Sequence, residues 1–230
     1  RRLALSTKTT PERRGRPRKT DDFDARSAIL LAAEEVFTAK GMQGASIREI
    51  ALLAGINPSL VPYHFQTKEH LYKELIDARA RWLNERRDAL LTDLEEYHAP
   101  GFPPLEEVLG CFVRPVFELK EKEPGAWSKF TQLLFNEAGS DLMREVMETN
   151  ISPIFRRFAT ILRRMLPSVQ HADIIFILEM TLQTTVIASP RHARIMLDDQ
   201  LQAEWTDEET ERRIVQSMTA AARSFAASGR

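Results

Sequence analysis

The 230-residue sequence lacks the residues for internal disulfide bonds and the long apolar run of a membrane anchor. Its single cysteine, Cys111, excludes a disulfide within the chain and a cysteine metal cluster, and indicates a reducing compartment. Free cysteines are among the most buried residue types, so we interpret Cys111 as a small apolar residue rather than a nucleophile. No apolar run approaches the roughly 20 residues of a membrane span, and the N-terminus is charged where a signal peptide is apolar. We therefore expect a cytoplasmic protein without a membrane partner.

Neither sign of charge dominates the whole chain, whose formal net charge is -1, but the charge is unevenly placed. Residues 1–20 hold eight Lys and Arg against one Glu, so the remaining 210 residues carry a net charge of -8. A basic arm on an acidic body suggests that the arm meets a polyanion and that the body has another task.

The scarcity of glycine (9 residues) and the absence of long alternating apolar and polar stretches favour an all-α fold. Apolar residues at spacings of three and four predict a first helix from Asp22 or Asp24 to Lys40, ended by Gly41. Ser46-Ile47-Arg48-Glu49 has the pattern of a capping box and predicts a second, two-turn helix. Asn57-Pro58 predicts a third helix start, and Thr67 a fourth helix reaching about Tyr97.

The spacing from Ser46 to Phe65 compresses two capped helices and a glycine turn into 20 residues. This layout is typical of a helix-turn-helix, in which the second helix enters the major groove of DNA. An ordinary helical hairpin is the alternative that spacing alone leaves open.

The residues of this segment carry a family resemblance. Capped helix, glycine turn, Tyr63-His64-Phe65 and Lys68-Glu69-His70-Leu71 stand at the spacing of the DNA-binding domain of the TetR family of bacterial transcriptional regulators, which residues 24–76 closely resemble. Pro62 departs from the family pattern, because a proline at a fifth helical position removes an amide and can cost about 3 kcal/mol. The third helix is therefore expected to be kinked or reduced to one turn.

Arg14-Gly15-Arg16-Pro17 has the pattern of an arm that lies in the minor groove, where arginines meet the negative potential of narrow A·T tracts; the alternative is a solvated tail. The resemblance implies phosphate contacts by Ser46, Tyr63, His64 and Lys68 and base contacts by residues 58–62, although His64 is alternatively a packing residue. The full predicted DNA-binding set is Arg14, Arg16, Arg18, Lys19, Ser46, Asn57, Pro58, Ser59, Leu60, Val61, Pro62, Tyr63, His64 and Lys68.

The resemblance also implies a body that binds a small effector and forms a homodimer through its last two long helices. Two narrow seams fit that interface, with an intramolecular core as the alternative: Ile175, Leu178, Leu182 and Thr185 in one, and Ile214, Met218, Ala221 and Phe225 in the other. Apolar residues that line an effector pocket, or alternatively belong to plain core, are Trp82, Trp127, Phe130, Leu134, Met143, Met147, Phe176 and Met180. The arginines of residues 156–164 are interpreted as a solvated helix face, with a second nucleic-acid patch as the alternative.

These observations predict an arm (1–22), a helix-turn-helix domain (23–76) and a helical effector-binding and dimerisation domain (77–230). An enzyme with an all-α body is disfavoured, because the five histidines form no metal-binding pair, no phosphate-binding glycine loop is present, and no serine lies in a nucleophile elbow. We expect no cofactor and no metal. The predicted function is that of a homodimeric repressor released from double-stranded, palindromic operator DNA by a small apolar ligand; an architectural or partner-recruiting DNA-binding protein without an effector is the alternative. Bound to DNA, it would be associated with the nucleoid.

Overall fold

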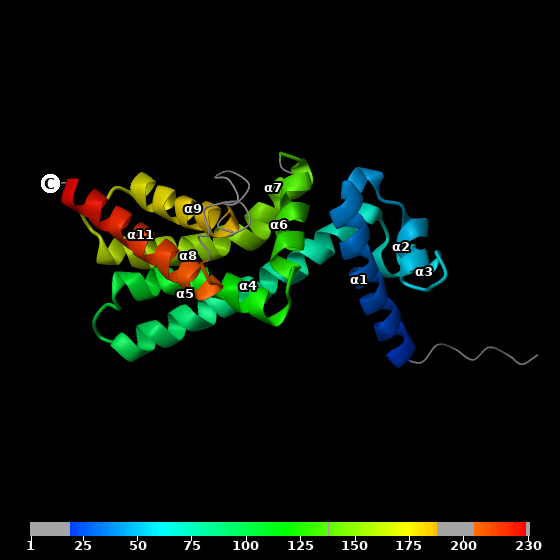
Figure 1. The fold of residues 1–230 in the computed structure, drawn as a ribbon, viewed down its shortest axis with the longest axis horizontal. Helices are drawn as coiled ribbons and strands as arrows, with labels where there is room; N and C mark the ends of the chain where they lie inside the picture. Colours follow the sequence, from blue (N-terminus) through cyan, green and yellow to red (C-terminus); the bar gives the residue numbers. More distant parts are fainter. Residues whose placement is uncertain (1–18, 138, 188–204, 229–230) are drawn as a thin grey trace, which may run out of the picture.

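Helices and the turns between them make up the described part of the chain, which in this computed structural model is residues 19–137, 139–187 and 205–228 (Figure 1). The all-α fold class is thereby confirmed. Helices α1, α2 and α3 lie at one end of the molecule, and α9 and α11 lie at the other. Among the described helices, none is both long and apolar enough to cross a membrane.

The first four helices match the sequence prediction closely. They are α1 (Lys19–Gly44), α2 (Ile47–Leu53), α3 (Leu60–Phe65) and α4 (Lys68–His98). Gly41 interrupts α1 as expected: its φ of 68° lies in the region that glycine reaches without a steric penalty, so the regular helix stops there. With 31 residues, α4 is about 45 Å long at 1.5 Å per residue and runs from the α1–α3 end into the body (Figure 1).

The remaining helices form the body. They are α5 (Leu105–Lys122), α6 (Ala126–Asn136), α7 (Asp141–Val146), the π-helical turn η1 (Met147–Ile151), α8 (Ser152–Met165), α9 (His171–Ile187) and α11 (Asp207–Ser228). The break that Pro153 predicts inside the segment 141–165 is present, since a proline near the start of α8 needs no amide partner. Asn150, in η1, donates a hydrogen bond to Asp77 (2.7 Å) and so fastens the π turn to α4.

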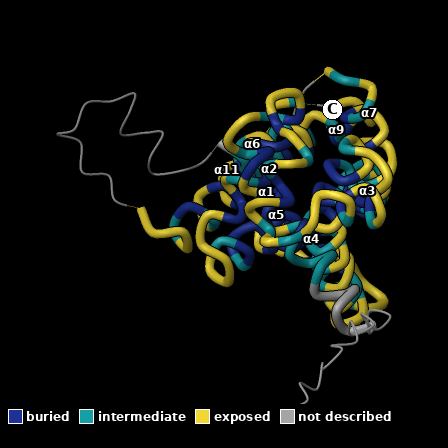
Figure 2. The backbone as a smooth tube through the Cα atoms, turned by 90° about the vertical axis from the view of Figure 1, so that its right-hand side faces the viewer, coloured by how far each residue is buried: buried dark blue, intermediate teal, exposed yellow. Residues whose placement is uncertain are grey.

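Two hydrophobic cores hold these helices together. The first joins α1–α3 and the first half of α4 to α6, α7 and the end of α5, and the second lies among α5, α8, α9 and α11. The buried stretches appear in dark blue in Figure 2. Tyr72 of α4 marks the first core: its ring meets Phe37 edge-on, and its hydroxyl donates to the Leu133 carbonyl of α6 (2.6 Å). Burial raises the pKa of Tyr72 well above its usual value, so this donor stays protonated.

Candidate nucleic-acid interface

The first helix of the helix-turn-helix begins at an N-cap serine. The Ser46 side chain accepts a hydrogen bond from the Glu49 amide (3.2 Å), which satisfies one of the free donors at the start of α2. The reciprocal half of the predicted capping box is replaced, because the Glu49 carboxylate pairs with Lys40 of α1. The N-terminus of α2 is thereby fixed against α1 while Ser46 itself stays exposed.

The second helix begins two residues later than predicted. The Asn57 side chain accepts hydrogen bonds from the amide (3.0 Å) and the hydroxyl (2.8 Å) of Ser59, forming a local turn, and the α-helix starts at Leu60. Pro62 is therefore the third helical residue, where the helix has no use for the missing amide. The helix is short, six residues, and Pro62 is accommodated without breaking it.

A tight turn joins α3 to α4. Gln66 adopts φ 61° and ψ -63°, and the Thr67 amide donates to the Phe65 carbonyl, which together form a γ-turn. Thr67 then caps α4 by accepting from the His70 amide (3.0 Å), as predicted. Lys68 reaches back and donates to the Ala45 carbonyl (3.1 Å), so the start of α4 is tied to the residue that precedes Ser46.

Of the residues predicted to contact DNA whose burial the structure describes, most are open to solvent. Ser46, Asn57, Pro58, Ser59, Pro62 and Tyr63 are exposed, and Leu60, His64 and Lys68 are partly buried. Tyr63 is 71 % exposed and meets the His64 ring edge-on. The helix-turn-helix therefore offers hydroxyl, phenol and short apolar groups, which suit phosphate oxygens and thymine methyl groups.

Val61 is the exception, and its prediction as a base-contacting residue is wrong. Its side chain is 1 % exposed and belongs to the first core with Ile50 and Phe65. Neighbouring side chains of a helix point about 100° apart, so Val61 can face the core while Leu60 and Pro62 are less buried.

We expect Val61→Ala to lower the free energy of unfolding by about 2 kcal/mol, because it removes two methyl groups from the core and leaves a cavity. Leu52→Ala, at a side chain that is 82 % exposed on α2, is the matched control and should change it by less than about 0.5 kcal/mol. Urea denaturation measures both. Equal stability of the two variants would contradict the placement of Val61 in the core.

The predicted arm lies largely outside the described residues. Arg14, Arg16 and Arg18 precede them, and of Lys19 only the backbone is described, as the first residue of α1. Their contacts with DNA remain predictions.

The eight residues predicted to line one effector pocket do not come together. Trp127, Phe130, Leu134 and Met143 pack in the first core, whereas Phe176 lies on α9, is half exposed and does not belong to that core. A cavity of about 330 Å³ lies between α1, α4 and α5, and of the eight only Trp82 lines it. Helical spacing identified apolar faces correctly, but most of those faces are used for packing within the chain.

The predicted dimer seams divide in a similar way. Leu178, Thr185 and Ile214 are buried within one chain, so the prediction that they form the interface is wrong for these three. Thr185 is satisfied internally, since its hydroxyl donates to the Thr181 carbonyl (2.6 Å). The other five, Ile175, Leu182, Met218, Ala221 and Phe225, are only partly buried, and Phe225 meets the half-exposed Phe176 edge-on.

Two features of this region were not identified from the sequence. Arg48 lies exposed in the first turn of α2, beside the Ser46 cap, where a cation is well placed for phosphate. Arg79 of α4 pairs with Glu34 of α1 and with Glu123 after α5. The position of Arg48 next to a capped helix start could have identified it from the sequence. The partners of Arg79 lie 44 and 45 residues away, so no local pattern indicated them.

Known proteins resemble this chain over both of its parts. Residues 29–75 match the family described as bacterial regulatory proteins of the tetR family, and residues 110–221 match the tetracyclin repressor-like C-terminal domain. The HTH-type transcriptional repressor BepR of Brucella suis is 37 % identical over 67 residues, which are 29 % of this chain. That match spans only 32 % of the length of BepR, so this chain covers about a third of that relative.

Solved structures extend the likeness to the whole fold. HlyIIR, a hemolysin II transcriptional regulator, superposes with a TM-score of 0.60 at 19 % identity over 86 % of this chain and 98 % of its own. A TetR/AcrR-type transcriptional regulator from Aquifex aeolicus does so with a TM-score of 0.52 at 21 % identity, over 85 % and 98 %. These similar proteins are transcriptional regulators, not enzymes. With family matches over both the helix-turn-helix and the helical body, the chain belongs to the TetR family of bacterial transcriptional regulators.

Proposed function

We propose that the protein is a homodimeric, DNA-binding transcriptional repressor that a small, largely apolar ligand releases from a palindromic operator. The observation that carries the proposal is the exposed set of hydroxyl, phenol and apolar side chains between Ser46 and Tyr63, in the helix-turn-helix of a chain of this family. Such groups suit phosphate positioning and base contact, and such a protein acts in the cytoplasm.

Two copies are required because a single six-residue recognition helix reads few base pairs. Two-fold symmetry places two such helices on half-sites one DNA turn apart, about 34–36 Å, and makes the operator a palindrome. The partly buried residues of α9 and α11, at the opposite end from α2 and α3, are the surface we assign to the partner.

Selection of bound fragments from a random DNA pool tests the proposal. The expected result is a pseudopalindromic consensus whose half-site centres lie about one turn apart. A pool without any consensus would overturn sequence-specific regulation. If the protein binds a consensus sequence and no ligand changes its affinity for that DNA, the architectural or partner-recruiting role is favoured instead.

The arm and the helix-turn-helix should contribute differently to DNA binding: the arm through salt-dependent contacts with phosphates, and the helix-turn-helix through contacts that depend on the base sequence. Removing residues 1–18 should weaken binding to every duplex and flatten its salt dependence by about 0.9 for each phosphate that the arm neutralises, since each neutralised phosphate releases a counterion. Ser59→Ala should instead change the preferred sequence while it keeps the salt slope. Binding isotherms at several salt concentrations measure both, and an unchanged slope without the arm would remove the arm from the interface.

A further inference from the structure

The cavity of about 330 Å³ lies where the DNA-binding end meets the body. Its lining comes from α1, which carries the helix-turn-helix, from α4, and from the last turn of α5. Small-molecule sites begin at about 300 Å³, so the cavity has the volume for a small ligand.

We call this cavity the junction groove. Its walls are mainly apolar. Leu30 of α1, Leu75 of α4 and Leu119 of α5 supply aliphatic surface, and the indole of Trp82 supplies an aromatic wall. Leu31, also in the lining, is 66 % exposed. A ligand with an apolar body would cover this surface and gain hydrophobic free energy roughly in proportion to the area removed from water.

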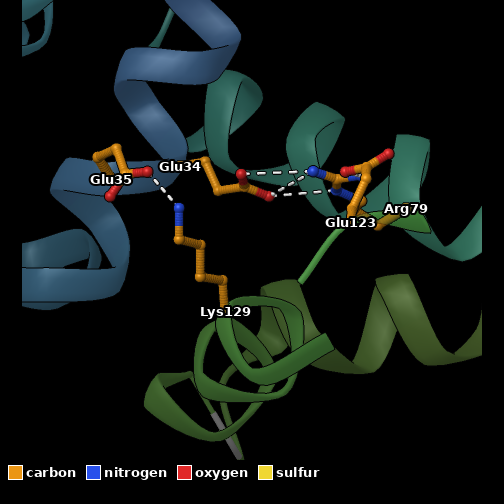
Figure 3. Close-up of polar contacts among 5 residues, drawn as sticks. All are labelled: Glu34, Glu35, Arg79, Glu123 and Lys129. Carbon is orange, nitrogen blue, oxygen red and sulfur yellow. Dashed lines mark hydrogen bonds and ion pairs between the residues drawn. The ribbon is translucent and has the colours of Figure 1, made fainter. Parts of the chain in front are cut away.

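The charges at the groove do not balance around Arg79. Its guanidinium lies 3.1 Å from the Glu34 carboxylate and 2.6 Å from that of Glu123, so two carboxylates share one cation (Figure 3). Glu34 is only 5 % exposed, which places its charge where screening by water is weak. One net negative charge is left at the wall of the groove.

Lys122 supplies the balancing positive charge from inside the groove. Its ammonium lies 5.1 Å from the centre of the Trp82 ring, in a cation–π contact. Lys122 is the last residue of α5 and is exposed, so its flexible side chain can turn out to solvent. The face of Trp82 is therefore a preformed cation site, occupied by a group that can leave.

We propose that the junction groove binds a hydrophobic organic cation, an ammonium group on an aromatic or alkyl body, which takes the place of the Lys122 ammonium over Trp82. The apolar body lies against the leucines, and the positive charge faces Glu34 and Glu123. This inference deepens the proposed function and rests on it: it names the ligand class and places the effector between the two parts of the protein.

The position of the groove supplies the coupling to DNA. Arg79 connects α1 to the end of α5, and Glu35 of α1 pairs with Lys129 of α6 close by (Figure 3). A ligand cation competes with Arg79 for its two carboxylates and so weakens the link between α1 and the body. The helix-turn-helix moves with α1, and a coupling of about 5- to 150-fold in operator affinity is the usual scale.

Three probes with one phenylbutyl body test the ligand class: the cation 4-phenylbutylammonium, the neutral 4-phenyl-1-butanol and the anion 4-phenylbutyrate. Titration of the full chain, followed by the NMR signal of the Trp82 indole N–H, should give an affinity about fivefold higher for the cation than for either other probe. The Trp82→Phe variant identifies the signal. Equal affinities for the three probes would overturn the proposed charge selectivity.

Variants then locate the site by calorimetric titration with the same cation. Glu123→Gln, at a half-exposed carboxylate, should weaken cation binding about fivefold, and Trp82→Leu should weaken it about threefold. Glu121→Gln, an exposed neighbour outside the lining, is the matched control and should bind as the unaltered protein does. Unaltered binding in Glu123→Gln and Trp82→Leu would place the cation elsewhere and overturn the proposal.

The operator readout separates the two proposals. The cation at saturation should lower operator affinity at least about fivefold, and operator DNA should weaken cation binding by the same factor. Cation binding in the groove without this reciprocal effect would overturn its role as effector. A failure to bind any consensus DNA, with cation binding intact, would overturn the proposed function and leave the binding site standing.

Discussion

Replacing Phe176 and Phe225 together with glutamate should convert the protein into monomers at micromolar concentration. Phe176 is 50 % exposed on α9, and its ring meets Phe225 of α11 at 6.2 Å between ring centres. In a two-fold dimer joined by these helices, the double variant places four carboxylates in an apolar seam, which costs several kcal/mol when they are unpaired. Sedimentation velocity measures the change.

The same variant should bind the operator at least about 100-fold more weakly. Two linked recognition helices bind with an avidity that exceeds that of one by roughly 10²- to 10⁴-fold, and the monomer forgoes this gain. The protomer itself should stay folded, because both rings are already partly exposed in the single chain. Helical circular dichroism with a cooperative melt checks this point.

Tyr97→Glu is the matched control for the dimer experiment. Tyr97 is 83 % exposed near the end of α4 and outside the α9–α11 surface, so its replacement should leave both the dimer and operator binding intact. A double variant that still sediments as a dimer would move the interface away from α9 and α11.

Local signals predicted the helix-turn-helix end almost residue by residue. Ser46 and Thr67 cap α2 and α4, and Gly41 interrupts α1. These features were predictable because each depends only on residues within three or four positions. The register of α3 was missed by two residues for a related reason. Asn57 forms its turn with Ser59 before the helix begins. Val61 was misplaced for a different reason: neighbouring helical residues point about 100° apart, so residues 58–62 cannot all face one side.

Contacts between residues that are distant in the sequence could not be predicted from it. Helical spacing marked Leu178, Thr185 and Ile214 as members of seams with their neighbours, but spacing does not say whether a seam meets the same chain or a second copy. Nothing in the sequence connects Arg79 with Glu34 and Glu123, which lie 45 and 44 residues away. The junction groove depends on these contacts and on the crossing of α1, α4 and α5.

A buried arginine in the body leads to the last prediction. Arg87 of α4 is 2 % exposed; it donates to the Phe112 carbonyl (2.9 Å) and to Asn84, and its guanidinium lies over the Phe112 ring. Across the described residues, no carboxylate pairs with it. Burial alone lowers the pKa of Arg87 to about 10, so at neutral pH the fold carries an uncompensated charge.

Arg87→Met should therefore raise the free energy of unfolding at pH 7 by about 1–4 kcal/mol, because a similar-sized apolar chain removes the cost of desolvating the charge. Arg86→Met is the matched control one residue earlier: it removes a partly buried ion pair with Glu118 and should lower the free energy of unfolding by about 1 kcal/mol. Urea denaturation of the two variants beside the unaltered protein gives both differences. A loss of stability in Arg87→Met would mean that its contacts with Phe112 outweigh the desolvation of its charge.

The pH dependence of this gain identifies its cause. The folded chain holds the Arg87 proton less tightly than the unfolded chain, so between the folded pKa, about 10, and the higher unfolded pKa the unfolded state binds more protons. Stability of the unaltered protein thus recovers as the pH rises through this window, and the advantage of Arg87→Met should be constant from about pH 6 to 9 and shrink above about pH 10. An advantage that persists unchanged to about pH 11 would assign the gain to better packing of methionine rather than to removal of the buried charge.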